Sequence, residues 1–227
     1  MAGRGRSAMG PSWAVMTGNP VWMLAPTTRM KPGSFVGRYR RPRRCLHAYT
    51  DPHTTESDCM TPAPIPANDA ERLRALRELL ILDTPPEERF DRLVEFAASE
   101  FDMPIVLISL IDSERQWFKA RVGMAACETS RDISFCGHAI LQHELFQVMD
   151  ALADPRFADN PLVVGDPFIR FYIGAPLTLP GGATVGTLCL IDTKPREFDA
   201  MDRAILGTLR DLAIAELTGQ AGAGASA

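Results

Sequence analysis

The sequence predicts an α+β domain in which helices pack on the faces of a central antiparallel sheet. Segments with the apolar pattern of β-strands fill the middle of the chain, and short turns join most of them into hairpins. Segments with helical spacing of apolar residues flank this region on both sides. Hairpin-linked strands flanked by helices are typical of an α+β domain, because parallel strands would need a helical crossover between them.

Two helices are expected before the first strand. The first follows Asn68, a residue type favoured as an N-cap, and ends near Asp83, before two prolines. Its apolar residues are Leu73, Leu76, Leu79 and Leu80. The second helix begins at Pro86 and Glu87, because proline and acidic residues are favoured in a first turn. The apolar residues on its predicted inner face are Phe90, Leu93, Val94, Ala97 and Phe101.

The next segments predict a hairpin, a short helix and a short strand. Residues 104–111 are apolar on both alternating faces, which indicates a central strand covered on both sides. Residues 116–122 form the second strand of the hairpin, after a turn at residues 112–114. A short helix is expected at residues 134–141 and a short strand at residues 145–149.

The stretch from Asp150 to Ile169 is expected to be a long loop of the kind that closes over a binding site. It has three prolines, five Asp or Asn residues and no strong period. Strands at residues 170–179 and 183–191 follow as a hairpin with a Pro-Gly-Gly turn. The last helix runs from the N-cap Asp199 to about Thr218. Its predicted inner face is Met201, Ile205, Leu209, Leu212 and Leu217.

Charge divides the chain into an arm, a domain and a tail. Residues 1–66 carry nine basic and three acidic residues and half of the prolines, so we expect a disordered basic arm. Residues 67–218 form the expected domain, and residues 219–227 a disordered tail of small residues. Met60 is an alternative start, which would leave a compact protein without most of the arm.

Composition excludes several classes of protein. No run approaches the ~20 apolar residues of a membrane span, and no clean secretory signal is present. Five cysteines, an odd number, favour a reducing compartment, so a cytoplasmic location is expected. The arginines at positions 38–44 could touch phosphate backbones, but the strongly acidic domain argues against a nucleic-acid partner.

Six ordered segments carry a resemblance to a known family. They are residues 82–91, 115–119, 132–140, 154–161, 169–177 and 186–192. Together they resemble a bacterial GAF domain, the type found before histidine-kinase and diguanylate-cyclase modules, from about Asn68 to Thr218. The resemblance implies a sheet of five or six antiparallel strands and a pocket between the sheet and the helix-and-loop side. It also implies a sensor of small molecules or redox state, or a dimerisation module.

Three chemistries of GAF domains can be compared with the residues. The Asn-Lys…Phe…Asp-Glu signature of cyclic-nucleotide binders is missing, and Cys136 is followed by Gly137 rather than by the histidine of bilin binders. Free methionine-(R)-sulfoxide reductases use three cysteines, and Cys127 and Cys136 fall near two of these places. The third, catalytic cysteine belongs in the long loop, which has none, so no enzyme activity is expected. Such a reductase is the alternative.

Seven residues are candidates for binding a ligand. They are Phe135, Cys136, His138, Phe157, Asn160, Arg170 and Tyr172. His138 could bind a ligand or a backbone carbonyl, and Phe157 and Asn160 could close over a ligand or only pin the long loop down. Arg170 and Tyr172 lie two apart on one strand and share a face. They either offer an anion site in the pocket or face outward, where they pair with acids of the long loop. Cys127 and Cys136 are candidates for a redox pair, and Cys189 for a small buried hydrophobic residue.

We therefore expect a non-catalytic, cytoplasmic sensory domain without a metal or cofactor. It would bind an unknown small molecule and signal to a partner such as a histidine kinase or diguanylate cyclase in trans. Apolar flanking helices favour a homodimer. No nucleic acid or membrane is expected as a partner, and a purely dimerising module is a further alternative.

Overall fold

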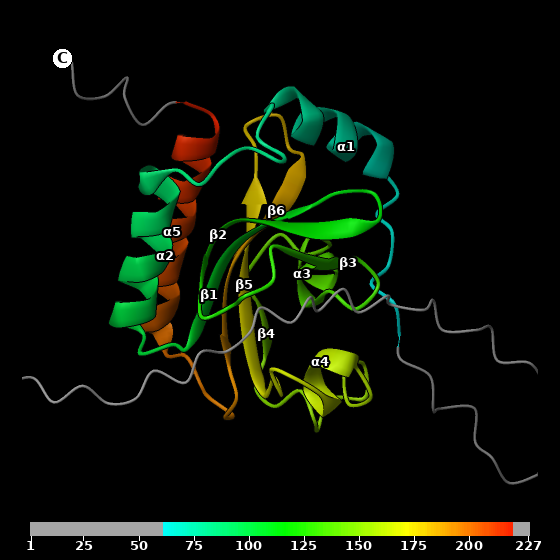
Figure 1. Ribbon diagram of the computed structural model, residues 1–227, viewed down its shortest axis with the longest axis vertical. Helices are drawn as coiled ribbons and strands as arrows, with labels where there is room; N and C mark the ends of the chain where they lie inside the picture. Colours follow the sequence, from blue (N-terminus) through cyan, green and yellow to red (C-terminus); the bar gives the residue numbers. More distant parts are fainter. Residues whose placement is uncertain (1–60, 220–227) are drawn as a thin grey trace, which may run out of the picture. The chain divides into compact units, whose positions relative to one another are not determined.

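A six-stranded antiparallel sheet forms the centre of the structure, a computed structural model that describes residues 61–219 (Figure 1). The strands are β1 (Ile105–Ile111), β2 (Arg115–Val122), β3 (Glu128–Ser130), β4 (Phe146–Val148), β5 (Phe171–Thr178) and β6 (Thr184–Asp192). Their order is β3-β2-β1-β6-β5-β4, and every neighbouring pair is antiparallel. The predicted fold class and both predicted hairpins are confirmed.

Helices cover the two faces of the sheet unequally. The helices are α1 (Asp69–Glu78), α2 (Glu88–Glu100), α3 (Phe135–Ala139), α4 (Pro161–Val164) and α5 (Ala200–Leu217). The long helices α2 and α5 lie side by side on one face, and the short helices α3 and α4 lie on the other (Figure 1). In the part of the chain described here, no helix combines the length and the apolar character that crossing a membrane requires.

The central strands separate two apolar cores. Along β1, Val106, Ile108 and Leu110 pack under α2 and α5, while Leu107 and Ile111 pack under α3. All seven residues of β1 are buried, as its uninterrupted apolar run predicts. The face under α3 is therefore covered mainly by short helices and loops.

The predicted inner face of α5 was partly wrong. Met201 is 68% exposed and Leu212 is 49% exposed, whereas Leu209 is buried as expected. Ala213 is fully buried beside Leu209 in the core shared with α2, because its small side chain lets the helices pack closely. The N-cap was correct: Asp199 accepts from the backbone N–H groups of Met201 and Asp202.

Helix α1 is shorter than predicted and is held by charge as well as by apolar packing. Asn68 is the N-cap residue as predicted, but its side chain makes no capping hydrogen bond. Leu80 lies beyond the end of the helix and is 84% exposed. Instead, α1 buries Leu76 together with Arg72, which the apolar pattern could not indicate.

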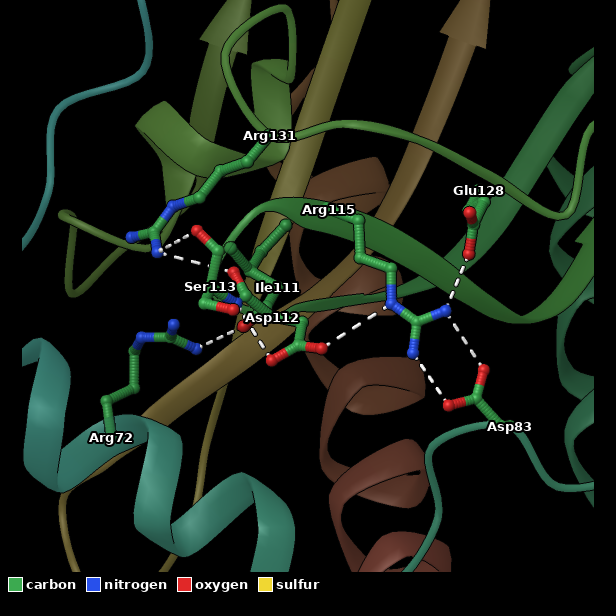
Figure 2. A network of polar contacts seen from close by, with 8 residues as sticks. All are labelled: Arg72, Asp83, Ile111, Asp112, Ser113, Arg115, Glu128 and Arg131. Carbon is green, nitrogen blue, oxygen red and sulfur yellow. Dashed lines mark hydrogen bonds and ion pairs between the residues drawn. The ribbon is translucent and has the colours of Figure 1, made fainter.

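Two buried arginines fasten α1 to the turn between β1 and β2 (Figure 2). Arg72 donates to the carbonyl of Ile111 and to the carboxylate of Asp69. Arg131 donates two hydrogen bonds, of 3.0 and 3.1 Å, to the same carboxylate. Arg131 also donates to the carbonyl of Asp112 at 3.3 Å. Burial acts to raise the pKa of Asp69, but the hydrogen bonds from both arginines outweigh it and lower the pKa. The ionised carboxylate therefore links the helix to the loop before α3.

The domain begins before Asn68. Ala63, which the sequence assigns to the arm, is buried, and its N–H donates to the carbonyl of Asp132 at 3.2 Å. The segment before α1 therefore lies against the residues that lead into α3. The expectations for the arm over residues 1–60 and for the tail over residues 220–227 lie outside the described residues.

Two short elements were not predicted. Strand β3 pairs with β2 at the edge of the sheet, and α4 lies inside the expected loop. Three or four residues are too short to show a hydrophobic period. The signal for α4 was instead local, because Asn160 caps the helix and Pro161 occupies its first turn.

Gly186 and Gly207 provide a matched test of the packing. A Cβ on Gly186 would lie 1.9 Å from the Ser109 carbonyl oxygen, so Gly186→Ala should destabilise the domain by about 2 kcal/mol. A Cβ on Gly207, inside α5, meets no atom within 4 Å, so Gly207→Ala should stabilise by about 0.5–1 kcal/mol. Urea unfolding of both variants measures this. Equal changes in the free energy of unfolding for the two variants would contradict the close approach of β6 to β1 at Gly186.

Candidate functional site

The face of the sheet beneath α3 carries most of the predicted site residues. Phe135 stacks on Phe157 with ring centroids 4.1 Å apart and lies 5.2 Å from the ring of Tyr172. His138 meets the Phe157 ring edge-on at 4.9 Å, and Phe146 lies 6.3 Å from the same ring. Phe157, from the long segment between β4 and β5, therefore joins that segment to α3 and the sheet.

A side-chain cap sets the start of α3. The Ser134 hydroxyl accepts from the N–H of Gly137 at 2.9 Å and donates to the Gln116 side chain on β2. A Cβ on Gly137 would lie 2.5 Å from the Cβ of Ala63, so the segment before α1 can lie close to this helix only because Gly137 has no side chain. These contacts turn Phe135 and Cys136 toward the sheet.

The cavity at this site is small. Its volume is about 20 Å³, and its walls include Gln116, Ser134, Phe135, Cys136 and Tyr172. That space holds about one water molecule, whereas ligand pockets usually measure ~300–1,000 Å³. The pocket therefore lies where the sequence predicts it, but side chains nearly fill it.

Three of the seven candidate residues line this cavity, and two more pack next to the lining residue Phe135 or its neighbour. Phe135, Cys136 and Tyr172 are at its wall. Phe157 is fully buried, and His138 is 8% exposed. The structure thus brings five of the candidates together on one side of the sheet.

Asn160 and Arg170 contact backbone groups around the segment between β4 and β5. The Asn160 amide donates to the Ile133 carbonyl at 3.0 Å, and its oxygen caps α4. Arg170 donates to the carbonyls of Val163 and Ile169, each at 3.0 Å. Neither residue lines the cavity, and Arg170 pairs with carbonyls instead of acidic side chains. Both side chains add contacts to the loop, whose own backbone hydrogen bonds lie mostly within short turns.

His138 lies in an environment that favours the neutral ring. Burial lowers its pKa, and the positive charge of Arg156 lowers it further. The Thr61 backbone and Asp154 act in the opposite direction but do not outweigh these effects. A neutral imidazole suits its position against the Phe157 ring.

A buried group of polar side chains was missed by the sequence reasoning. The Cys136 sulfur lies 3.6 Å from the Cys189 sulfur, and the Tyr172 hydroxyl donates to Cys136 at 3.2 Å. Ser109 and Thr187 pair in register on β1 and β6, on the same sheet face. The sequence signal that could have indicated this group was a polar residue inside a largely apolar strand, Ser109 in β1 and Thr187 in β6. The candidate redox partner Cys127, by contrast, is exposed, whereas Cys136 is buried.

The pKa values of the two buried thiols are shifted in opposite directions. Burial acts to raise the pKa of Cys136, but the contact with Cys189, the hydrogen bond from Tyr172 and the nearby Thr187 and Ser109 hydroxyls outweigh it and lower the pKa to about 7. Burial and the neighbouring Cys136 raise the pKa of Cys189 well above its usual value. Burial and the same thiols raise the pKa of Tyr172, so its hydroxyl stays a donor. Cys136 is therefore the thiol that ionises first.

Comparisons with known proteins support the architecture. Residues 85–217 match the model of the GAF domain family, which is more than half of the chain. A cyclic di-GMP phosphodiesterase of Pseudomonas aeruginosa is 44% identical over 137 residues, which are 60% of this chain. The match spans only 23% of that relative's length.

Two crystal structures illustrate the likeness of fold. The GAF domain of an Acinetobacter phosphoenolpyruvate-protein phosphotransferase has a TM-score of 0.51 and 18% identity, covering 71% of this chain and 99% of its own. The free methionine-R-sulfoxide reductase of Neisseria meningitidis, solved with its substrate, has a TM-score of 0.50 and 19% identity, covering 73% and 99%. At such identities the likeness concerns the fold alone.

Proposed function

The chain belongs to the GAF domain family, whose fold is a sensory one, and we propose that it regulates a partner by binding a small molecule beneath α3. The contrast between the two sheet faces carries this proposal. Helices α2 and α5 close one face with large apolar side chains, whereas two short helices and a long segment cover the other. The backbone hydrogen bonds of the long segment lie mostly within its own short turns, so it can move away from the sheet without breaking strand pairing. Ligand entry would therefore displace the segment from Asp150 to Ile169.

The residues of the site favour one class of ligand. The rings of Phe135, Phe157 and Tyr172 offer stacking surfaces, and Gln116 and Ser134 lie at the same wall. A planar, largely apolar molecule with a single polar group fits this chemistry best. Movement of Phe157 would create the space, because its ring fills the region between α3 and β4.

A thermal-shift screen of planar metabolites tests the proposal. A ligand at about 100 times its Kd should stabilise the domain by about 2.7 kcal/mol. His138→Gln should reduce the shift, because His138 packs on the ring that must move. His143→Gln is the matched control, because His143 is exposed and should leave the shift unchanged. If no compound raises the Tm at millimolar concentrations, the proposal is overturned and a purely dimerising module is favoured.

We propose further that the domain is not a catalyst. The support is that the segment from Asp150 to Ile169 contains no cysteine, and that the cavity at Cys136 is too small for methionine sulfoxide. Incubation with free methionine sulfoxide and dithiothreitol should give no reduction above the protein-free rate. Turnover that disappears in Cys136→Ser would instead establish the reductase alternative.

A homodimer and a signalling enzyme are the proposed partners. Phe96 on α2 is 52% exposed, and Met201 and Leu212 on α5 are 68% and 49% exposed, so the helix pair offers apolar surface to a second copy. Light scattering should give a dimer mass that Leu212→Glu converts to a monomer mass. A monomeric wild-type protein at about 100 μM would contradict this, because stable dimers have Kd values far lower.

A further inference from the structure

Five buried polar side chains converge between α3 and the centre of the sheet. Cys136 comes from α3, Ser109 from β1, Tyr172 from β5, and Thr187 and Cys189 from β6. None is more than 1% exposed. The two sulfurs are 3.6 Å apart, which is van der Waals contact, so they are neighbours that a modest shift of α3 could join.

The hydroxyls of this cluster are unusual because two of them lack a partner. Within residues 61–219, Ser109 Oγ and Thr187 Oγ1 are buried and make no hydrogen bond that meets normal geometry. Such groups cost about 1–3 kcal/mol when they stay unsatisfied. Both hydroxyls contribute to lowering the pKa of Cys136, so they can donate to a thiolate there. The cluster is thus arranged to hold a negative sulfur.

The small cavity lies beside Cys136. Its lining includes Cys136 together with the partly buried residues Met124, Thr129 and Leu162. A volume of about 20 Å³ admits a molecule of roughly the size of water. Hydrogen peroxide, with two heavy atoms, would need only slight widening of this cavity, whereas glutathione disulfide and other bulky oxidants would need far more.

We propose that Cys136 and Cys189 form a peroxide-sensitive dithiol that closes to an internal disulfide. The Cys136 thiolate attacks one peroxide oxygen; an S–O bond forms, the O–O bond breaks, and the departing hydroxide takes the proton released by Cys136. The Cys189 sulfur then attacks the sulfenic sulfur, the S–O bond breaks, and the second hydroxide leaves as water with the Cys189 proton. Two electrons pass from the thiols to the peroxide, giving one disulfide and two waters.

Closure of the disulfide would change the site itself. The sulfurs must approach from 3.6 Å to about 2.05 Å, which draws α3 toward β6. Cys136 is in the cavity wall, so the cavity and the segment around Ala63 that lies against α3 would shift with it. The reaction needs no organic ligand, so it is independent of the ligand-binding proposal.

Mass spectrometry of the full-length chain tests the dithiol. After peroxide treatment, unfolding and alkylation, we expect a peptide linking Cys136 to Cys189 that dithiothreitol removes. Cys189→Ser should stop at a Cys136 sulfenic acid, which dimedone present during unfolding traps, and Cys127→Ser should leave the linked peptide unchanged. Tyr172→Phe removes the donor and should slow the reaction up to about tenfold, the effect of one pKa unit on the thiolate fraction.

The exposed thiol of Cys127 supplies an internal reference in the same sample. If Cys136 and Cys189 both remain alkylable after unfolding, at a peroxide dose that fully oxidises Cys127, the proposal is wrong. This readout uses the wild-type chain, so it holds even where a cysteine variant fails to fold. No ligand is added, so failure here leaves the thermal-shift result unaffected.

Discussion

Arg72→Ala should lower the free energy of unfolding by about 3–5 kcal/mol, the usual cost of breaking a buried ion pair. Arg72 is 1% exposed and donates both to the Ile111 carbonyl and to Asp69 (Figure 2 shows the first contact). Its removal leaves that buried carbonyl without this charged donor and empties the volume of a large side chain. Urea unfolding followed by circular dichroism measures the change.

Arg74→Ala is the matched control for this prediction. Arg74 lies on the same helix, is exposed, and should change stability by no more than about 0.5 kcal/mol. Equal losses in the two variants would contradict a specific role of the buried network, because alanine has the highest helix propensity and cannot weaken α1 by that route. A loss confined to Arg72 would show that charged contacts hold α1 to the β1–β2 turn.

Phe157→Ala should cost about 3–5 kcal/mol, as for other fully buried phenylalanines. Its ring is 0% exposed, stacks on Phe135 at 4.1 Å and meets the edge of His138 at 4.9 Å. Truncation removes the main apolar anchor between the β4–β5 segment and α3. It should also convert the cavity of about 20 Å³ into a larger apolar space.

A small aromatic probe checks the second consequence. Indole or benzene at millimolar concentration should raise the Tm of Phe157→Ala and leave the wild-type Tm unchanged, because only the variant has room for a ring. Phe96→Ala is the control, since Phe96 is 52% exposed on α2. An unresponsive Phe157→Ala protein would mean that the site collapses after truncation.

Much of the fold was predictable because its signals are local and repeated. The apolar run at residues 104–111 indicates a strand buried on both faces, and the Asp199 cap indicates the start of α5. The orientation of α5 was less predictable, because Ala213 and not Leu212 faces α2. A small residue selected for close helix packing contributes little to a hydrophobic pattern.

The candidate site was predictable in position but not in its interactions. Phe135, Cys136 and Tyr172 meet at the cavity, on the side of the sheet where the family resemblance implies a pocket. The roles of Asn160 and Arg170 depend on which loop carbonyls lie near them, and no periodicity encodes that. The partner of Cys136 is likewise set by strand register, which places Cys189 on β6 beneath α3.

Amide hydrogen exchange on the unmodified, ligand-free chain tests most directly the claim that the α3 face is the one that opens. Peptides from residues 150–169 and from α3 should exchange through local opening at a free energy well below that of β1, β6 and α5. Addition of a ligand found in the screen should then protect these same peptides. If residues 150–169 exchange as slowly as α5, opening only with global unfolding, the face is a closed core and the account is wrong.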